Sequence, residues 1–301
     1  MKIVIAGGTG FLGRPLARAL AASHTVVILS RQPTPPPADG PARIVPWNPT
    51  TTGAWAEEID GAGAVINLAG TSIAGRRWSP AHKRRILDSR IDATRALADA
   101  IRAAAHPPHV FVSGSAVGYY GPLGDELVTE AHPAGRDFLA GVCAAWELEA
   151  TRRARDATRV VCVRTGLVLD QHGGALPQML LPFKIGAGGP LGSGRQYWPW
   201  IHRDDWVALV RWAIDTPSAS GPVNATAPNP VTNAELSRAL GRALHRPAFM
   251  PAPAFALRIA LGEMADALLL SGQRAVPAKA LELGFVFRHT QIDAALRAIL
   301  G

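Results

Sequence analysis

Four glycines lie close together near the start of the chain, at positions 7, 8, 10 and 13. An apolar run over 2–6 precedes them and a helical pattern over 11–20 follows them. Residues without a Cβ allow the backbone to turn tightly, to approach a pyrophosphate and to pack the helix on the strand, while the helix N-terminus faces the phosphates. A strand before the glycines and a helix after them predict a dinucleotide-binding turn.

Arg31 follows the next apolar run, Thr25–Ser30, about 20 residues beyond the glycine turn. An acidic residue at this place would bind the ribose 2′-hydroxyl of NAD(H), but this sequence has an arginine there instead of an acidic residue. A guanidinium instead pairs with a 2′-phosphate through charge-assisted, bidentate hydrogen bonds. The sequence therefore favours NADP(H) as the cofactor.

Composition is typical of a globular protein, with 48% hydrophobic and 18% charged residues in 301. The apolar stretch after Lys2 is too short for a signal peptide, and no uninterrupted apolar run is long enough to cross a membrane. We therefore expect a cytoplasmic protein with no membrane partner. The two cysteines, Cys143 and Cys162, indicate neither a disulfide framework nor a metal site, and we expect both to be buried.

A net charge of +8 is accompanied by a basic cluster over 76–102, most of it on a predicted helix from Pro80 to Ala104. Acidic residues lie three or four positions from these basic residues, which indicates a solvated, salt-bridged face. We therefore expect no nucleic-acid partner.

Strand and helix patterns alternate through the first half of the chain. Strands are expected near 2–6, 25–30, 43–46, 63–67, 109–114 and 159–165. This alternation predicts an α/β fold, a Rossmann-type doubly wound parallel sheet, and such sheets bind ligands beyond the carboxyl ends of the strands. The proline-rich stretch 33–41 is expected to be an exposed connection.

The second half is expected to form a small, mostly helical C-terminal substrate domain. We assign 1–169 to the dinucleotide-binding domain, to which 204–226 returns, and 170–203 with 227–301 to the substrate domain. The glycine-rich stretch 186–194 is predicted to form a lid, and Asn233 to cap a helix.

The motifs together resemble the extended short-chain dehydrogenase/reductases of the NAD(P)-dependent epimerase/dehydratase branch. They include Asn67-Leu-Ala-Gly70, Val112-Ser-Gly-Ser-Ala-Val-Gly-Tyr-Tyr-Gly121 and Arg164-Thr-Gly166. The chain looks most similar to an atypical epimerase-family subgroup that carries Arg-Arg-Trp after the fourth strand, here 76–78, and a C-terminal segment of unassigned role, here 251–300. Members of the family often pair through helices of the first domain, so the resemblance is compatible with a homodimer.

The resemblance implies a cofactor contact for nine residues. Gly7, Thr9, Gly10, Phe11 and Leu12 would line the pyrophosphate, Arg31 the 2′-phosphate, and Leu68, Ala69 and Gly70 the adenosine side and ribose.

The proton-transfer pair of the family is missing from this chain. The resemblance implies a tyrosine, with a lysine four residues later, on the helix expected over 137–149, where the lysine lowers the tyrosine pKa. The corresponding places fall near Leu139 and Cys143, and none of the three tyrosines has a lysine four residues later. This chain therefore lacks the residues for the family's usual proton transfer by a tyrosine and a lysine.

Three interpretations remain open. In the first, the protein is an oxidoreductase or epimerase-like enzyme of small organic or sugar-like substrates. Tyr119 or Tyr120 then donates the proton, and Ser115 or Ser113 hydrogen-bonds the substrate oxygen, which favours reduction over oxidation. In the second, it is a catalytically silent NADP(H)-binding regulatory or interaction protein. In the third, the cofactor acts with other acid and base groups.

Further residues are candidates for substrate contact, and no metal site is expected. Arg195 is placed to clamp an anionic group, and Trp198 and Trp200 to stack on a planar or sugar-like ligand. A histidine side chain ordinarily titrates near neutrality, and His202 lies between aromatic residues and Asp204-Asp205, so it is a candidate for proton transfer. Tyr120 is expected to line the substrate pocket if it is not the proton donor.

Overall fold

A computed structural model of the chain describes residues 1–31, 42–153 and 157–301. The expected connection over 33–41 lies outside these residues. The main sheet contains seven parallel strands in the order β11-β7-β5-β4-β1-β2-β3. The bounds are β1 Lys2–Ala6, β2 Thr25–Ser30, β3 Ala42–Pro46, β4 Ala64–Asn67, β5 Val110–Ala116, β7 Arg159–Thr165 and β11 Gly221–Ala225. The predicted Rossmann-type parallel sheet is confirmed.

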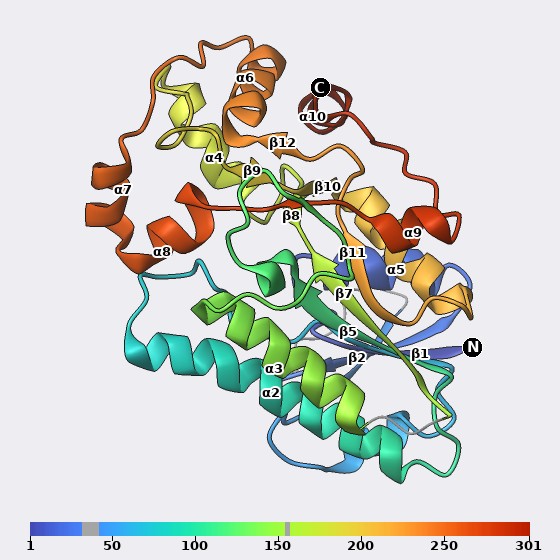
Figure 1. Cartoon of the computed structure of the whole chain (residues 1–301). Coiled ribbons are helices and arrows are strands. Elements are labelled where there is room, and N and C mark those ends of the chain that lie inside the picture. The colour runs from blue at the N-terminus through green and yellow to red at the C-terminus, as the bar shows by residue number, and fades with distance from the viewer. Residues whose placement is uncertain (32–41, 154–156) are drawn as a thin grey trace.

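Helices cover both faces of this sheet, as expected for strands that are apolar on both sides. Helices α1 (Gly13–Ala21) and α5 (Arg203–Asp215) pack on one face, where Leu16 and Trp206 join the strand residues in one core cluster. Helices α2 (Pro80–Ala103) and α3 (Phe138–Arg153) lie side by side on the other face (Figure 1), where Leu97 and Ala150 belong to a second cluster.

A smaller, mostly helical layer gathers beyond the sheet, at the top of Figure 1. Its apolar core contains Phe183, Trp198, Trp200, Leu236 and Leu296. Its helices are α4 (Leu176–Lys184), α6 (Asn233–Leu244), α7 (Ala254–Leu261), α8 (Glu263–Ala265) and α10 (Ile292–Leu300). Helix α9 (Ala278–Glu282) instead packs beside β11, and its Ala280 belongs to the core on the α1 and α5 face of the sheet.

Short strand pairs and short helical turns lie in the loops outside the main sheet. The strand pairs are β8 (Leu167–Leu169) with β10 (Trp200–His202), β9 (Tyr197–Trp198) with β12 (Val231–Thr232), and β6 (Leu127–Val128) with β13 (Arg274–Ala275). The turns are η1 (Ala54–Glu58), η2 (Val117–Tyr120) and η3 (Asp266–Leu270). None of these elements was predicted from the sequence, because each is too short to show a hydrophobic period.

Two local expectations for the C-terminal layer are corrected. Thr232, and not Asn233, caps α6, and its side chain and Glu235 bond each other's backbone N–H in a capping box. The glycine-rich stretch is not a free lid, because backbone hydrogen bonds tie 188–192 to 250–252. Gly189 lies so close to the Met250 backbone that a Cβ there would overlap it.

Both cysteines are buried, as expected. Within the described ranges, no helix is long and apolar enough to cross a membrane.

Candidate functional site

The glycine turn connects β1 to α1 and packs against the loop after β4. Gly7 has a φ of +80°, a conformation that favours glycine, and the Gly10 N–H donates to its carbonyl at 3.0 Å. A Cβ on Gly7 would lie 2.8 Å from the Leu68 carbonyl carbon, and a Cβ on Gly13 would overlap the Gly7 carbonyl oxygen. The turn therefore needs glycine at both positions.

The N-terminus of α1 is open to a ligand. Its N-cap residue is Leu12, no side chain caps it, and its first turn contains no acid. Among the described residues, nothing accepts a hydrogen bond from the N–H groups of Phe11 or Leu12. Free N–H groups and the positive end of the helix dipole favour an anion at this point.

The loop after β4 forms the other side of the turn. Leu68 donates its N–H to the Ala6 carbonyl, and the Ala69 N–H donates to the Asn67 side chain at 3.1 Å. Asn67 is itself fixed by donating to the Thr94 hydroxyl at 2.9 Å. The structure thus brings together the predicted cofactor residues of the glycine turn and this loop.

Arg31 is exposed just beyond the end of β2. Its guanidinium has no hydrogen-bond or ion-pair partner in the part of the chain that the structure describes. Because β2 is the neighbour of β1 in the sheet, Arg31 lies at the same carboxyl edge as the glycine turn.

Ser115 lies at the same edge, on β5, two strands away from β1. Ala6, Asn67 and Ser113 form one register row across β1, β4 and β5. Ser115 is 5% exposed and donates its hydroxyl to the Glu147 carboxylate on α3 at 2.6 Å. In this arrangement the Ser115 hydroxyl proton is bonded to Glu147, so it is not free to be donated to a substrate oxygen.

Glu147 is held by a second partner, Arg164 on β7. The Nε and a terminal nitrogen of Arg164 each donate to one carboxylate oxygen at 2.8 Å, and the side chains are only 3% and 12% exposed. This bidentate ion pair outweighs the burial of the guanidinium and raises the pKa of Arg164. The Glu147–Arg164 ion pair is therefore buried and bonded to Ser115 near the end of β5.

Tyr120 belongs to this buried network, which corrects its expected place in a substrate pocket. It is 1% exposed, donates to the Asn224 side chain at 2.6 Å and accepts from Arg164 at 2.9 Å. Burial raises the pKa of Tyr120 to about 12. Its hydroxyl is both inaccessible and fully bonded.

Tyr119 differs from its neighbour. It is partly exposed on η2, and its ring lies against the Arg164 guanidinium, 3.5 Å from the ring centroid. Its hydroxyl bonds no other described residue. Of the two loop tyrosines, Tyr119 is therefore the one that is partly exposed and whose hydroxyl bonds no described residue.

Leucine and cysteine occupy the two positions of α3 at which the family's tyrosine and lysine are expected. Leu139 lies against Gly118, and Cys143 is 4% exposed. Burial, with a contribution from Glu147, raises the pKa of the Cys143 thiol to about 12, so this thiol is neutral near neutral pH. Arg90 of α2 packs nearby over the Trp146 ring and donates to the Thr71 carbonyl at 3.1 Å.

The aromatic candidates for substrate stacking lie in the core. Trp198 is 7% exposed, and Trp200 is fully buried and donates its indole N–H to the Asn229 carbonyl at 3.0 Å. Neither indole can stack on a ligand in this arrangement. Arg195 is exposed, and its guanidinium has no partner among the described residues.

His202 is the N-cap of α5. Its ring accepts from the Asp204 N–H at 3.1 Å and stacks on His289, with 3.9 Å between ring centroids. Burial, and then the neighbouring His289, lower the pKa of His202. A neutral, buried ring that caps a helix has a structural role here.

Sequence reasoning missed Glu147 as a functional residue. It lies four residues after Cys143, and hence on the same face of α3, which is the signal that could have found it. Arg164 was noted within Arg164-Thr-Gly166, but its partner cannot be read from a motif.

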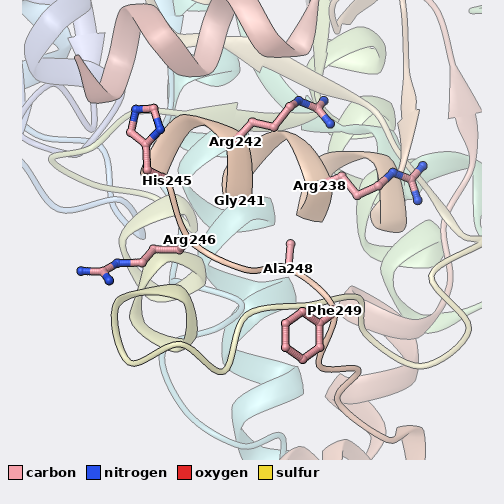
Figure 2. Close-up of a pocket in the computed structure, with 7 residues that line it drawn as sticks. All are labelled: Arg238, Gly241, Arg242, His245, Arg246, Ala248 and Phe249. Carbon is pink, nitrogen blue, oxygen red and sulfur yellow. The ribbon is translucent and has the colours of Figure 1, made fainter.

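A hollow of about 630 Å³ at the C-terminal end of α6 shares no residue with the predicted site. Figure 2 shows that the guanidinium groups of Arg238, Arg242 and Arg246 point in different directions rather than toward one point. Arg242 is paired with Asp293 at 2.7 Å. We therefore place no ligand there.

The described residues also contain no group of three His, Cys, Asp or Glu suited to a metal.

Residues 3–225 match the model of the NAD dependent epimerase/dehydratase family. The chain belongs to this family. Residues 252–299 also match a domain of unknown function, DUF1731, and the resemblance inferred from the motifs is confirmed.

Two relatives named as epimerase family proteins are similar to the whole of this chain. The chain is 42% identical over 308 residues to the chloroplastic SDR39U1 homologue, an epimerase family protein of Arabidopsis thaliana, covering 100% of this chain and 87% of that protein. It is 40% identical over 303 residues to the epimerase family protein YfhF of Bacillus subtilis, covering 100% and 98%. Since the first of these relatives is chloroplastic, the cytoplasmic location stays a prediction, as does the homodimer.

A solved structure supports the same assignment. The human epimerase family protein SDR39U1 (isoform 2), crystallised with NADPH, superposes with a TM-score of 0.89 at 36% identity, covering 100% of this chain and 99% of that one.

Proposed function

We propose that this epimerase-family chain is an NADP(H)-dependent enzyme, an oxidoreductase or epimerase-like protein that acts on a small organic or sugar-like substrate. The observation that carries the proposal is the uncapped N-terminus of α1, which begins at a turn where Gly7 and Gly13 have no room for a Cβ. Such a turn brings backbone N–H groups close to a pyrophosphate.

Arg31 supplies the preference for the phosphorylated cofactor. It is an exposed guanidinium at the carboxyl edge of the sheet, one strand from the glycine turn, and no described acid neutralises it. A 2′-phosphate offers the bidentate partner that this side chain lacks. The human relative was crystallised with NADPH, which agrees with this preference.

Proton transfer is assigned to Tyr119. NADPH, when bound, supplies the hydride for reduction of a carbonyl carbon. Tyr119 gives its hydroxyl proton to the substrate oxygen, and solvent restores the proton because the side chain is partly exposed. Ser115, with its proton held by Glu147, keeps its lone pairs for a donor group of the substrate.

A catalytically silent NADP(H)-binding protein is the second candidate. The observation that favours it is the pair Leu139 and Cys143, where the family's tyrosine and lysine are expected, since neither side chain can exchange a proton near neutral pH. The two candidates share the cofactor site and differ in the fate of the hydride.

Consumption of NADPH separates the two candidates. The purified protein is mixed with NADPH and a panel of small carbonyl compounds and keto sugars, and absorbance of the reduced nicotinamide is followed. The enzyme proposal predicts consumption that depends on one of these compounds and that falls about 100-fold or more in Tyr119→Phe, with NADPH affinity unchanged. Equal consumption by Tyr119→Phe would remove Tyr119 from the mechanism. Tight NADPH binding without consumption by any compound would favour the silent protein.

A further inference from the structure

A groove of about 770 Å³ lies between α1 and α5, on the face of the sheet opposite α2 and α3. Arg14 and Arg18 are four residues apart on α1, so they share one face of that helix. Asp204, Ala208 and Arg211 follow one another at four and three residues along α5, so they also share one face of their helix. The loop after β8 and Arg288 complete the walls.

The groove has an excess of positive charge. Its walls contain five arginines and two aspartates. Both aspartates are used by one arginine, because Arg203 bonds Asp170 and also Asp204, the latter at 3.0 Å.

The other arginines of the groove have no ion-pair partner among the described residues. They are Arg14, Arg18, Arg211 and Arg288. All four are exposed, and Arg14 is oriented by donating its Nε to the Thr9 carbonyl at 2.7 Å. Four unpaired guanidinium groups around one groove suit a ligand with several phosphate charges, since each group can bind phosphate oxygens bidentately.

The groove also has apolar lining residues. Pro15 and Ala19 lie on α1, and Val207 and Ala208 lie on α5. A volume of this size is within the range of small-molecule sites, which combine apolar walls with a few polar anchors. We propose that the groove binds a small anion carrying two or more phosphate groups on an apolar or planar body, of the nucleoside-diphosphate kind.

The groove shares one end with the predicted cofactor cleft, at the residues of the glycine turn, and otherwise lies apart from it. Thr9, Gly10 and Phe11 line one end of the groove, whereas Arg31 and the loop 68–70 do not line it. The Phe11 ring stands between the turn and the loop after β8, where a Cβ on Gly174 would lie 2.8 Å from it. A phosphate ligand in the groove therefore leaves the 2′-phosphate and adenosine contacts free.

The test is a calorimetric titration of the full chain, saturated with NADPH, with inorganic pyrophosphate and then with ADP. We expect saturable binding of one equivalent of each, with ADP tighter because of the apolar lining residues. The double variant Arg18→Gln, Arg211→Gln should weaken pyrophosphate binding about 10-fold or more, because two charge-assisted contacts are lost. Glutamine keeps an exposed polar side chain on each helix, and circular dichroism checks the fold.

A matched control is Arg238→Gln, Arg246→Gln, which removes two exposed arginines at the hollow of Figure 2 and leaves the groove intact. Pyrophosphate binding should be unchanged in this control and in Arg31→Gln. Absence of saturable binding, or equal weakening by both double variants, would overturn the proposal. If the chain fails to bind NADPH, the same titrations are made on the cofactor-free protein, where the loss of binding in Arg18→Gln, Arg211→Gln distinguishes the groove from the glycine turn.

Discussion

The hydroxyl of Ser115 donates to the carboxylate of Glu147 at 2.6 Å, and this bond joins the end of β5 to the middle of α3. Arg164 bonds the same carboxylate from β7 and contacts the ring of Tyr119. Three secondary-structure elements are thus fastened at the place where the family's tyrosine and lysine are missing. The network holds Ser115 and places the Arg164 guanidinium, paired with Glu147, against the ring of Tyr119.

Replacement of Glu147 by glutamine should strongly destabilise the protein. The change leaves the Arg164 guanidinium, whose side chain is 3% exposed, without its counter-charge. Breaking a buried pair in this way costs about 3–5 kcal/mol. Denaturant unfolding of Glu147→Gln measures this loss.

The control is Asp293→Asn, which makes the same chemical change in the exposed pair with Arg242. Its expected cost is below about 1 kcal/mol. Similar losses in the two variants would mean that the Glu147–Arg164 pair contributes no more than a surface pair.

Tyr120 should make stability depend on pH in the alkaline range. Burial raises its pKa in the folded state to about 12, whereas an unfolded tyrosine titrates near pH 10. The folded state therefore holds the proton more tightly, so this contribution is complete below about pH 10 and is lost as the pH rises toward 12. The loss is roughly 2–3 kcal/mol.

Other groups also titrate in this range, so the measurement is a comparison. The free energy of unfolding is determined at about pH 9 and about pH 11.5 for the native chain and for Tyr120→Phe. The native chain should lose more stability between the two pH values than the variant loses. Parallel losses would show that Tyr120 ionises in the folded state as it does in the unfolded state.

Gly7→Ala should damage both stability and cofactor binding. The new Cβ would combine a positive φ with an approach of 2.8 Å to the Leu68 carbonyl. Gly61→Ala is the matched control, because Gly61 has a φ of +66° and no atom within 4 Å of the Cβ position. We expect a cost of about 1–2 kcal/mol for Gly61→Ala from the backbone alone.

Overpacking at Gly7 should add roughly 1–3 kcal/mol to that cost. Thermal or denaturant unfolding measures both variants, and an NADPH titration should show weaker binding in Gly7→Ala alone. Equal stability of the two variants would show that the turn can move away from the loop after β4.

Arg31→Ala should reduce NADPH binding and leave NADH binding unchanged. The loss expected for one charge-assisted contact is about 1.5–3 kcal/mol. Arg18→Ala, which removes an exposed arginine from α1, is the control and should leave the preference between the two cofactors intact. Weakening of both cofactors by the same factor in Arg31→Ala would exclude contact with the 2′-phosphate.

The sequence predicts the sheet and the glycine turn well because both have local signals. Near-continuous apolar runs mark β4 and β7, and the glycines stand between a strand and a helix. The short strands and the 3₁₀ turn η2 lack such signals, since a few residues show no period.

The polar network around Ser115 cannot be predicted from the sequence for a different reason. Glu147 and Arg164 are 17 residues apart and lie on different elements, so only the packing of α3 on the sheet reveals the pair. Tyr119 and Tyr120 are adjacent and chemically identical, and the direction of η2 decides which hydroxyl is buried. Trp200 is expected from the sequence to stack on a ligand, but it lies in the apolar core. An aromatic side chain near a site has the same sequence signal as one in a core.

The cofactor proposal is tested most directly by calorimetric titration of the cofactor-free native chain with NADPH and then with NADH at one salt concentration. The uncapped helix N-terminus, the glycine turn and Arg31 together predict binding of NADPH at least about tenfold tighter than NADH, or about 1.4 kcal/mol. Equal binding of the two cofactors, or binding of neither, would contradict the assignment of this site to NADP(H).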